Sequence, residues 1–102
     1  MFTVKVVHKN YPGSTYCGRP SPLGNPFVMK TEADRETVCE QYELWFQENL
    51  ETLKPYLRNL WRLGVESGEL LLGCWCAPKR CHLETVKNFF ESQMNLTRKE
   101  TS

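Results

Sequence analysis

Two β-type segments stand far apart in the chain, with helical sequence between them. The first, FTVKVVH at residues 2–8, alternates apolar and polar side chains and is rich in β-branched residues, as half-buried strands are. The second, ELLLGCWC at residues 69–76, is a continuous apolar run, which is typical of a strand buried on both faces. Because strands separated by helices pair in parallel through a right-handed crossover, these two segments predict an α/β domain.

Three helices are expected around the strands. Residues 31–53 carry apolar side chains at three- and four-residue steps, with Asp34 as a plausible N-cap. Pro55 suits the first turn of a second helix, which Gly68 ends, and a third helix is predicted from about Cys81. The expected fold class is therefore α/β: a small single domain with a short, mainly parallel sheet flanked by about three helices, in a Rossmann-like arrangement.

The chain is long enough for one domain and one hydrophobic core. We expect this domain to cover residues 1–95, followed by a polar, disordered tail at residues 96–102. No apolar run approaches the roughly 18–20 residues of a membrane span, and the start shows no signal-peptide pattern. The odd number of five cysteines favours reduced thiols over a disulfide scaffold, so a soluble cytoplasmic protein is predicted.

The segment 9–30 has four prolines, three glycines and no helical period. Loops of this length are functional or disordered in most compact domains, and the aromatic residues here favour an ordered one. The stretches STYCG and PFVMK within it could add short strands. In a parallel sheet, the loops that follow the two strands leave from the same edge, where open α/β sheets bind ligands. Segment 8–30 and segment 76–82 should therefore face each other.

The loop offers a candidate anion site. Arg19, Ser21 and Asn25 supply side-chain donors on a frame stiffened by proline, which suits a phosphate or a carboxylate. Residues 1–30 contain four cations and no acid, whereas residues 31–54 contain seven acids and two cations. This asymmetry favours an anionic partner for the first segment. The alternative is a proline-rich surface loop that holds no ligand.

The stretch CWCAPKRCH at residues 74–82 permits three interpretations. Cys74, Cys76, Cys81 and His82 are residue types that bind zinc, although their spacing differs from the usual C-x₂-C knuckle. Alternatively, Cys81 and His82 at the start of a helix, beside Arg80, are candidate catalytic residues, since a helix N-terminus favours a thiolate. The third interpretation is that these cysteines, Cys74 above all, are small buried apolar residues.

Further candidates lie at the same edge. His8 ends the first strand there and is a possible ligand contact or acid/base group. Cys76 and Arg80 are expected to line the pocket together with the loop donors. Trp75 or Tyr16 could stack on a base, although either could equally belong to the core.

The motifs GRPSPLGNPF (18–27) and CWCAPKRCH (74–82) together resemble an uncharacterised family of small bacterial and bacteriophage proteins, which is marked by a GRxSPLGNPF loop and a CWCxPxxCH strand–helix junction. The likeness runs from about residue 2 to residue 95. The family usually continues with a glycine and an acid, where this chain has Leu83 and Glu84. The resemblance implies a protein of the bacterial or phage-infected cytoplasm, with these site residues: Arg19, Ser21, Asn25, Cys76, Cys81 and His82. A looser likeness to a second uncharacterised α/β group implies a nucleotide-like ligand.

Three functional hypotheses follow. The first is a pocket between residues 16–27 and 74–82 that binds a phosphate-bearing small molecule, such as a nucleotide, and leaves open whether the protein also acts on it as an enzyme. The second is a nucleic-acid-binding or host-targeting protein of phage type, which a net charge of only +1 disfavours. The third is a small zinc-stabilised module that binds another protein.

Overall fold

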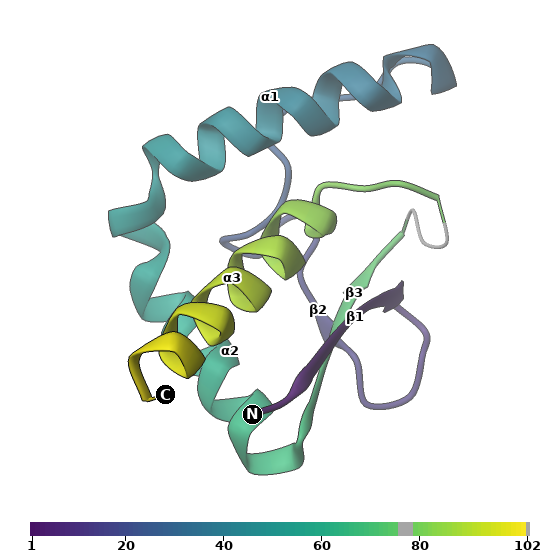
Figure 1. Ribbon diagram of the computed structural model, residues 1–102. Helices are drawn as coiled ribbons and strands as arrows, with labels where there is room; N and C mark the ends of the chain where they lie inside the picture. Colours follow the sequence, from purple (N-terminus) through teal and green to yellow (C-terminus); the bar gives the residue numbers. More distant parts are fainter. Residues whose placement is uncertain (76–78, 102) are drawn as a thin grey trace.

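A three-stranded parallel sheet organises the chain (Figure 1). The computed structural model describes residues 1–75 and 79–101. Strands β1 (Thr3–His8) and β2 (Thr15–Tyr16) both pair with β3 (Glu69–Cys74), which gives the order β1-β3-β2. The predicted parallel pairing of the two long strands is confirmed, and so is the α/β class.

The register of the sheet determines which residues lie at its carboxyl edge. Val4 lies opposite Leu70, and His8 lies opposite Cys74, so β1 and β3 end side by side. Tyr16 of β2 lies opposite Gly73, one residue before the end of β3. The chain therefore leaves all three strands at the same edge of the sheet.

Three helices complete the fold, and no helix in residues 1–75 and 79–101 is long and apolar enough to cross a membrane. They are α1 (Arg35–Glu48), which a 3₁₀ turn η1 (Glu32–Asp34) precedes, α2 (Leu50–Ser67) and α3 (Leu83–Thr101). Helix α2 packs against β3 and α3 packs against β1, while α1 crosses above the start of α3 in Figure 1.

The break between the first two helices lies earlier than the sequence predicts. The chain leaves helical geometry at Asn49 (φ −105°, ψ 12°), whose side-chain amide donates a hydrogen bond to the Trp45 carbonyl at 2.8 Å. Pro55 lies inside α2 rather than at its start. Proline has no backbone N–H, so the carbonyl of Glu51 lacks its helical hydrogen-bond donor. Both residues are exposed, and water can therefore bond to this carbonyl instead.

The last helix begins and ends later than the sequence predicts. Helix α3 starts at Leu83, two residues after Cys81, and continues to Thr101, so residues 96–101 are helical where composition predicts a disordered tail. The Thr97 hydroxyl bonds to the Gln93 carbonyl at 3.0 Å. Once a helix is anchored by buried side chains, extending it costs little, because each added residue gains one backbone bond.

In the part of the chain that the structure describes, the helices cover one face of the sheet. On that face Val4, Leu70 and Leu72 are buried, whereas Leu71, which points the other way, is half-buried. The loop after β1 covers the opposite face near the end of β3, where a Cβ on Gly73 would lie 3.1 Å from the Ser14 Oγ. The sequence predicts that β3 is buried on both faces. At the end of β3 this is the case, but a loop and not a helix covers the second face.

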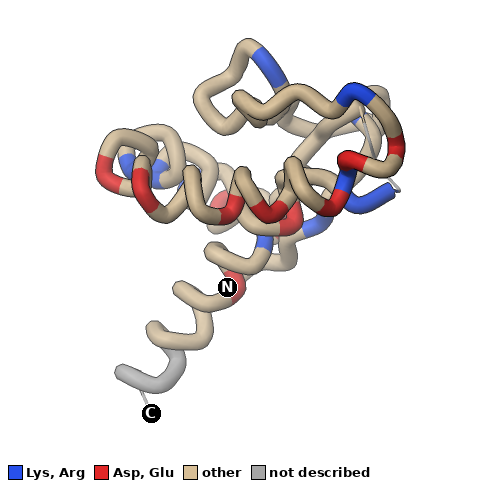
Figure 2. Tube along the Cα trace, turned by 90° about the horizontal axis from the view of Figure 1, so that it is seen from above, with Lys and Arg blue, Asp and Glu red and all other residues tan. Residues whose placement is uncertain are grey.

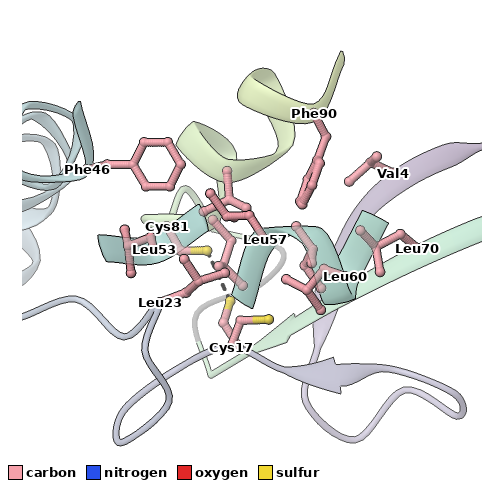
Figure 3. Close-up of a cluster of buried hydrophobic side chains, with 14 of the residues drawn as sticks. Val4, Cys17, Leu23, Phe46, Leu53, Leu57, Leu60, Leu70, Cys81 and Phe90 are labelled. Carbon is pink, nitrogen blue, oxygen red and sulfur yellow. Dashed lines mark hydrogen bonds between the residues drawn. The ribbon is translucent and has the colours of Figure 1, made fainter. Parts of the chain in front are cut away.

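One hydrophobic cluster joins the sheet to the helices, and Figure 3 shows part of it, with Phe46 and Phe90 among aliphatic side chains. The Phe2 ring packs edge-on against Trp61 of α2, with centroids 5.1 Å apart, and also contacts Phe90 of α3. Phe46 of α1 packs against Phe89 of α3 at 5.5 Å. All three helices therefore share a single core.

A buried hydrogen bond fixes the long loop to this core. The Tyr42 hydroxyl of α1 donates to the Leu23 carbonyl at 2.8 Å, and both side chains are fully buried. The loop is thus an ordered part of the fold. Of its two strand candidates, STYCG supplies β2, whereas PFVMK forms no strand.

We predict that Tyr42→Phe lowers the free energy of unfolding by about 1–2 kcal/mol, because it leaves the buried Leu23 carbonyl without a donor. Urea denaturation followed by tryptophan fluorescence measures this. Tyr11→Phe, at an exposed position of the same loop, is the matched control and should change stability little. Equal stability of the Tyr42→Phe variant and the parent would show that the bond does not hold the loop.

Candidate functional site

A pocket of about 350 Å³ opens at the carboxyl edge of the sheet, between the long loop, the start of α1 and the β3–α3 junction. The volume lies in the range of small-molecule sites. The sequence-predicted candidates that line it are Arg19, Asn25, Cys74, Arg80, Cys81 and His82. The expectation that the two loops face each other is therefore met in the described residues.

The charge of the wall has one sign. Arg19 comes from the loop, Arg35 from α1 and Arg80 from the junction, and no aspartate or glutamate lines the pocket among the described residues. Guanidinium groups bind phosphate and carboxylate oxygens in a planar, bidentate geometry. The wall thus suits an anion.

The Arg35 side chain is held in place on two sides. Its Nε and Nη2 donate to both carboxylate oxygens of Glu32, at 2.9 and 2.8 Å, and its Nη1 donates to the Arg80 carbonyl at 2.8 Å. These bonds lower the pKa of Glu32 to about 2, chiefly through the hydrogen bond from Arg35. The side chain is only 14% exposed, so its position is fixed before any ligand arrives.

Ion pairs join the junction to the start of α1. Arg80 pairs with Glu36, and the Lys79 Nζ lies 3.3 Å from a carboxylate oxygen of Glu32. Figure 2 shows the acids spread along α1, with cations gathered near the end where it meets the junction. Because exposed pairs stabilise a fold by only about 0–1 kcal/mol each, the main effect of these contacts is to position the pocket wall.

Arg19 differs from the other two arginines. Its side chain is exposed, and its guanidinium has no ion-pair partner within residues 1–75 and 79–101. Its backbone is fixed, since the Tyr16 hydroxyl donates to its carbonyl at 2.7 Å. A Cβ on Gly24 would lie 2.8 Å from the Arg19 Cα, so only glycine lets the loop fold back this closely.

His82 is a neutral side chain in the pocket wall. It is 8% exposed, and its Nε2–H donates to the Cys17 carbonyl at 3.2 Å, which leaves Nδ1 as the acceptor nitrogen. Its ring meets Tyr42 edge-on at 4.9 Å. Burial lowers the pKa of His82, and the charge of Arg19 lowers it further.

The cysteines fall into different environments. The Cys74 and Cys81 sulfurs lie 3.1 Å apart, both buried and both part of the pocket wall. Burial raises the pKa of Cys17 to about 11, so it stays a thiol. Cys76 lies outside the described residues, so the set of four zinc candidates is described only in part. Within the described residues, no three His, Cys, Asp or Glu side chains are placed to hold a metal ion.

The model of a family of domains of unknown function, DUF4326, matches residues 4–92, which include both loops of the pocket. The chain belongs to the DUF4326 family. No curated protein and no solved structure matches it. The expectation of an uncharacterised family is thus confirmed, while the function of this DUF4326 domain has to be argued from its site.

One loop donor, Asn25, has a structural role in the DUF4326 domain. The Asn25 side chain accepts a hydrogen bond from the Phe27 backbone at 2.9 Å and donates one to the Val38 carbonyl at 3.4 Å, which ties the loop to α1. The Ser21 hydroxyl is buried, does not line the pocket, and has no hydrogen-bond partner in the part of the chain that the structure describes.

The last predicted candidate, His8, lies beside the pocket and not in its wall. Its Nδ1 accepts a hydrogen bond from the Asn10 backbone at 3.2 Å, and its ring faces the edge of Trp75. Trp75 follows β3 directly and is 66% exposed, with the Lys9 Nζ 4.0 Å from its ring centroid. Trp75 is thus a surface residue at the pocket and not part of the core.

One wall of the pocket in the DUF4326 domain was not predicted from the sequence. It consists of residues from α1 and from the end of the loop: Phe27, Met29, Arg35, Val38 and Cys39. In the sequence, the first turn of α1 has the acidic residues that are common at a helix start, and Arg35 is a single cation among them. Only the crossing of α1 over the sheet edge brings these side chains to the site.

We predict that His82→Gln reduces the loss of stability that acid causes. A buried histidine with a lowered pKa stays neutral when folded but takes up a proton when unfolded, so its contribution is complete above about pH 6.5 and is lost as the pH falls below it. The measurement is the difference in melting temperature between pH 7.5 and pH 5.0. An unchanged difference in His82→Gln would contradict the assignment.

Proposed function

We propose that the pocket binds a phosphate-bearing small molecule, a nucleotide or a related compound. The observation that carries this proposal is that the described residues of the wall include three guanidinium groups and no carboxylate. Guanidinium groups in a wall that contains no acidic side chain favour an anion over a neutral or cationic ligand. The ordered hydrogen bonds of Arg35 reduce the entropy lost on binding, because its geometry is already set.

The three arginines would take different parts of the ligand's charge. Arg35 and Arg80 share their charge with Glu32 and Glu36, which do not line the pocket. Arg19 has no such carboxylate, so its full charge is available to a phosphate. We therefore assign Arg19 as the main anion contact, with Arg35 as a rigid donor at the back of the pocket.

An exposed aromatic ring beside the arginines supports a nucleotide over a smaller phosphate. Trp75 lines the pocket, and with Lys9, Tyr16 and Arg19 it also lines a shallower hollow next to it. A base that stacks on an exposed indole gains about 1–3 kcal/mol. The combination of stacking surface and cations next to the phosphate site is the chemistry that a nucleotide requires.

Should the domain act on its ligand, His82 and Cys81 are the candidate catalytic residues. The neutral imidazole has an acceptor nitrogen at Nδ1 and can take a proton from a bound group. The proposal concerns binding alone and includes no reaction step.

A nucleic-acid-binding role is the second candidate. It is favoured by the exposed Trp75 beside Lys9 and Arg19. The row of acids on α1 lies close to the same edge and would repel a phosphate backbone that continued past the pocket. A single nucleotide avoids this repulsion, and for that reason we place it first.

We predict that Arg19→Gln weakens ATP binding about 10-fold or more, since a hydrogen bond to a charged group contributes about 1.5–3 kcal/mol. Isothermal titration calorimetry at moderate salt measures the affinity. The melting temperature should stay within a few degrees because the side chain is exposed. Arg62→Gln, which removes the same charge from an exposed position of α2, is the control. Equal affinities of the two variants, or no binding of ATP, AMP or phosphate to the parent, would contradict the proposal.

We predict that Trp75→Ala weakens AMP binding about tenfold and leaves the affinity for inorganic phosphate unchanged, because only AMP has a base to stack. Both ligands are titrated against the same protein, so phosphate is the internal control. An equal loss for both ligands would assign Trp75 a structural role. Tight binding of a single-stranded oligonucleotide that disappears between low and moderate salt, without AMP binding, would favour the nucleic-acid alternative.

A further inference from the structure

Two buried thiols meet in the pocket wall from opposite sides of the β3–α3 junction. Cys74 is the last residue of β3, Cys81 lies two residues before α3, and their sulfurs are 3.1 Å apart (Figure 3). Their exposed fractions are 1% and 3%, yet both contribute to the pocket wall. A small oxidant that enters the pocket can therefore reach the pair, while a large one cannot.

We propose that Cys74 and Cys81 are a redox modification site, a dithiol that oxidises to a reversible disulfide. The sulfurs are only about 1 Å further apart than in a covalent S–S bond, so a small side-chain adjustment closes the distance. This assignment is independent of the ligand proposed above, since it rests on the sulfur geometry alone.

The reaction balances with a hydroperoxide as the oxidant. One cysteine sulfur attacks a peroxide oxygen, which forms a sulfenic acid and releases the first water. The second sulfur then attacks the sulfenic sulfur, which forms the S–S bond and releases a second water. Two thiols lose two electrons and hydrogen peroxide gains them. A small dithiol reductant reverses the step by thiol–disulfide exchange and is itself oxidised to a cyclic disulfide.

The neighbouring cysteine is a poorer partner. The Cys17 thiol donates to the Thr15 carbonyl at 3.4 Å, and Cys17 does not line the pocket through which an oxidant would enter. A shared zinc ion also fits the spacing less well, because two thiolates on a tetrahedral zinc lie about 3.8 Å apart for Zn–S bonds of about 2.3 Å. The separation of 3.1 Å favours direct bonding between the sulfurs.

The disulfide would act on the pocket through the segment that it closes. Residues 75–80 connect the two cysteines and include Trp75 and Arg80, both part of the wall. The bond would hold the end of β3 and the residues before α3 at a covalent distance, and Trp75 and Arg80 each lie next to one of its two cysteines. The oxidation state of the pair would thus affect the positions of Trp75 and Arg80 in the pocket wall.

Hydrogen peroxide is the probe for the test. The reduced, native chain is treated with a small excess of peroxide, unfolded, alkylated with iodoacetamide and digested with trypsin. We expect three of the five cysteines to be alkylated, and peptides 63–79 and 81–87 to appear as a linked pair. Dithiothreitol before alkylation should restore all five. Five alkylated cysteines after peroxide would overturn the proposal.

The Cys76→Ser variant identifies the partner, because Cys74 and Cys76 share one tryptic peptide. The linked pair should persist in Cys76→Ser, and its loss there would assign the bond to Cys76 and overturn the proposal. Cys74→Ser and Cys81→Ser should each abolish the pair, with folding checked by circular dichroism. A native mass that shows zinc, together with oxidation that occurs only after chelation, would instead identify a metal site and would equally overturn the proposal.

Discussion

Parallel hydrogen bonding between β1 and β3 is the constraint on which the other features of this domain depend. The register brings His8 and Cys74 side by side, so the chain leaves both strands at one edge. The long loop and the β3–α3 junction then have to share that edge, although residues 28–73 separate their motifs in sequence. A shift of the register by one residue would turn Leu70 and Leu72 away from the helices and would displace the pocket as well.

The pocket is built by two kinds of contact that differ in strength and purpose. The buried Tyr42–Leu23 hydrogen bond and the hydrophobic cluster hold the loop and α1 to the core. The exposed ion pairs of Glu32 and Glu36 contribute little to stability but orient Arg35 and Arg80 toward the pocket. The acids of α1 therefore do not oppose an anionic ligand directly, since they act from behind the wall.

The placement of titratable groups separates the charged part of the site from its neutral part. His82 and the two close cysteines lie in the buried wall, where burial disfavours charge on the imidazole. The guanidinium groups lie around them, nearer to solvent at Arg19. A bound phosphate would thus meet fixed positive charge at one side of the pocket and uncharged acceptors and thiols at the other.

Local sequence rules predicted the parts of the fold that depend on backbone preference and periodicity. The alternation in residues 2–8, the apolar run before Cys74 and the glycine stop at Gly68 all correspond to observed elements. The rules were wrong where a local signal competed with packing. Pro55 predicts a helix start but lies inside α2. The helix tolerates it because the missing backbone N–H leaves only one exposed carbonyl without a helical hydrogen bond. The polar residues 96–101 extend α3, because the buried turn before them anchors the helix.

The sequence by itself determined that this chain forms a parallel α/β domain, and that a glycine- and proline-rich loop meets a cysteine- and histidine-containing junction at one sheet edge. Parallel pairing has that consequence whatever the side chains are. Only the tertiary structure decided that α1 closes the pocket with Arg35, that Asn25 serves the loop, and that the Cys74 and Cys81 sulfurs meet. These features depend on distances between elements, which the packing of the core sets and no local pattern encodes.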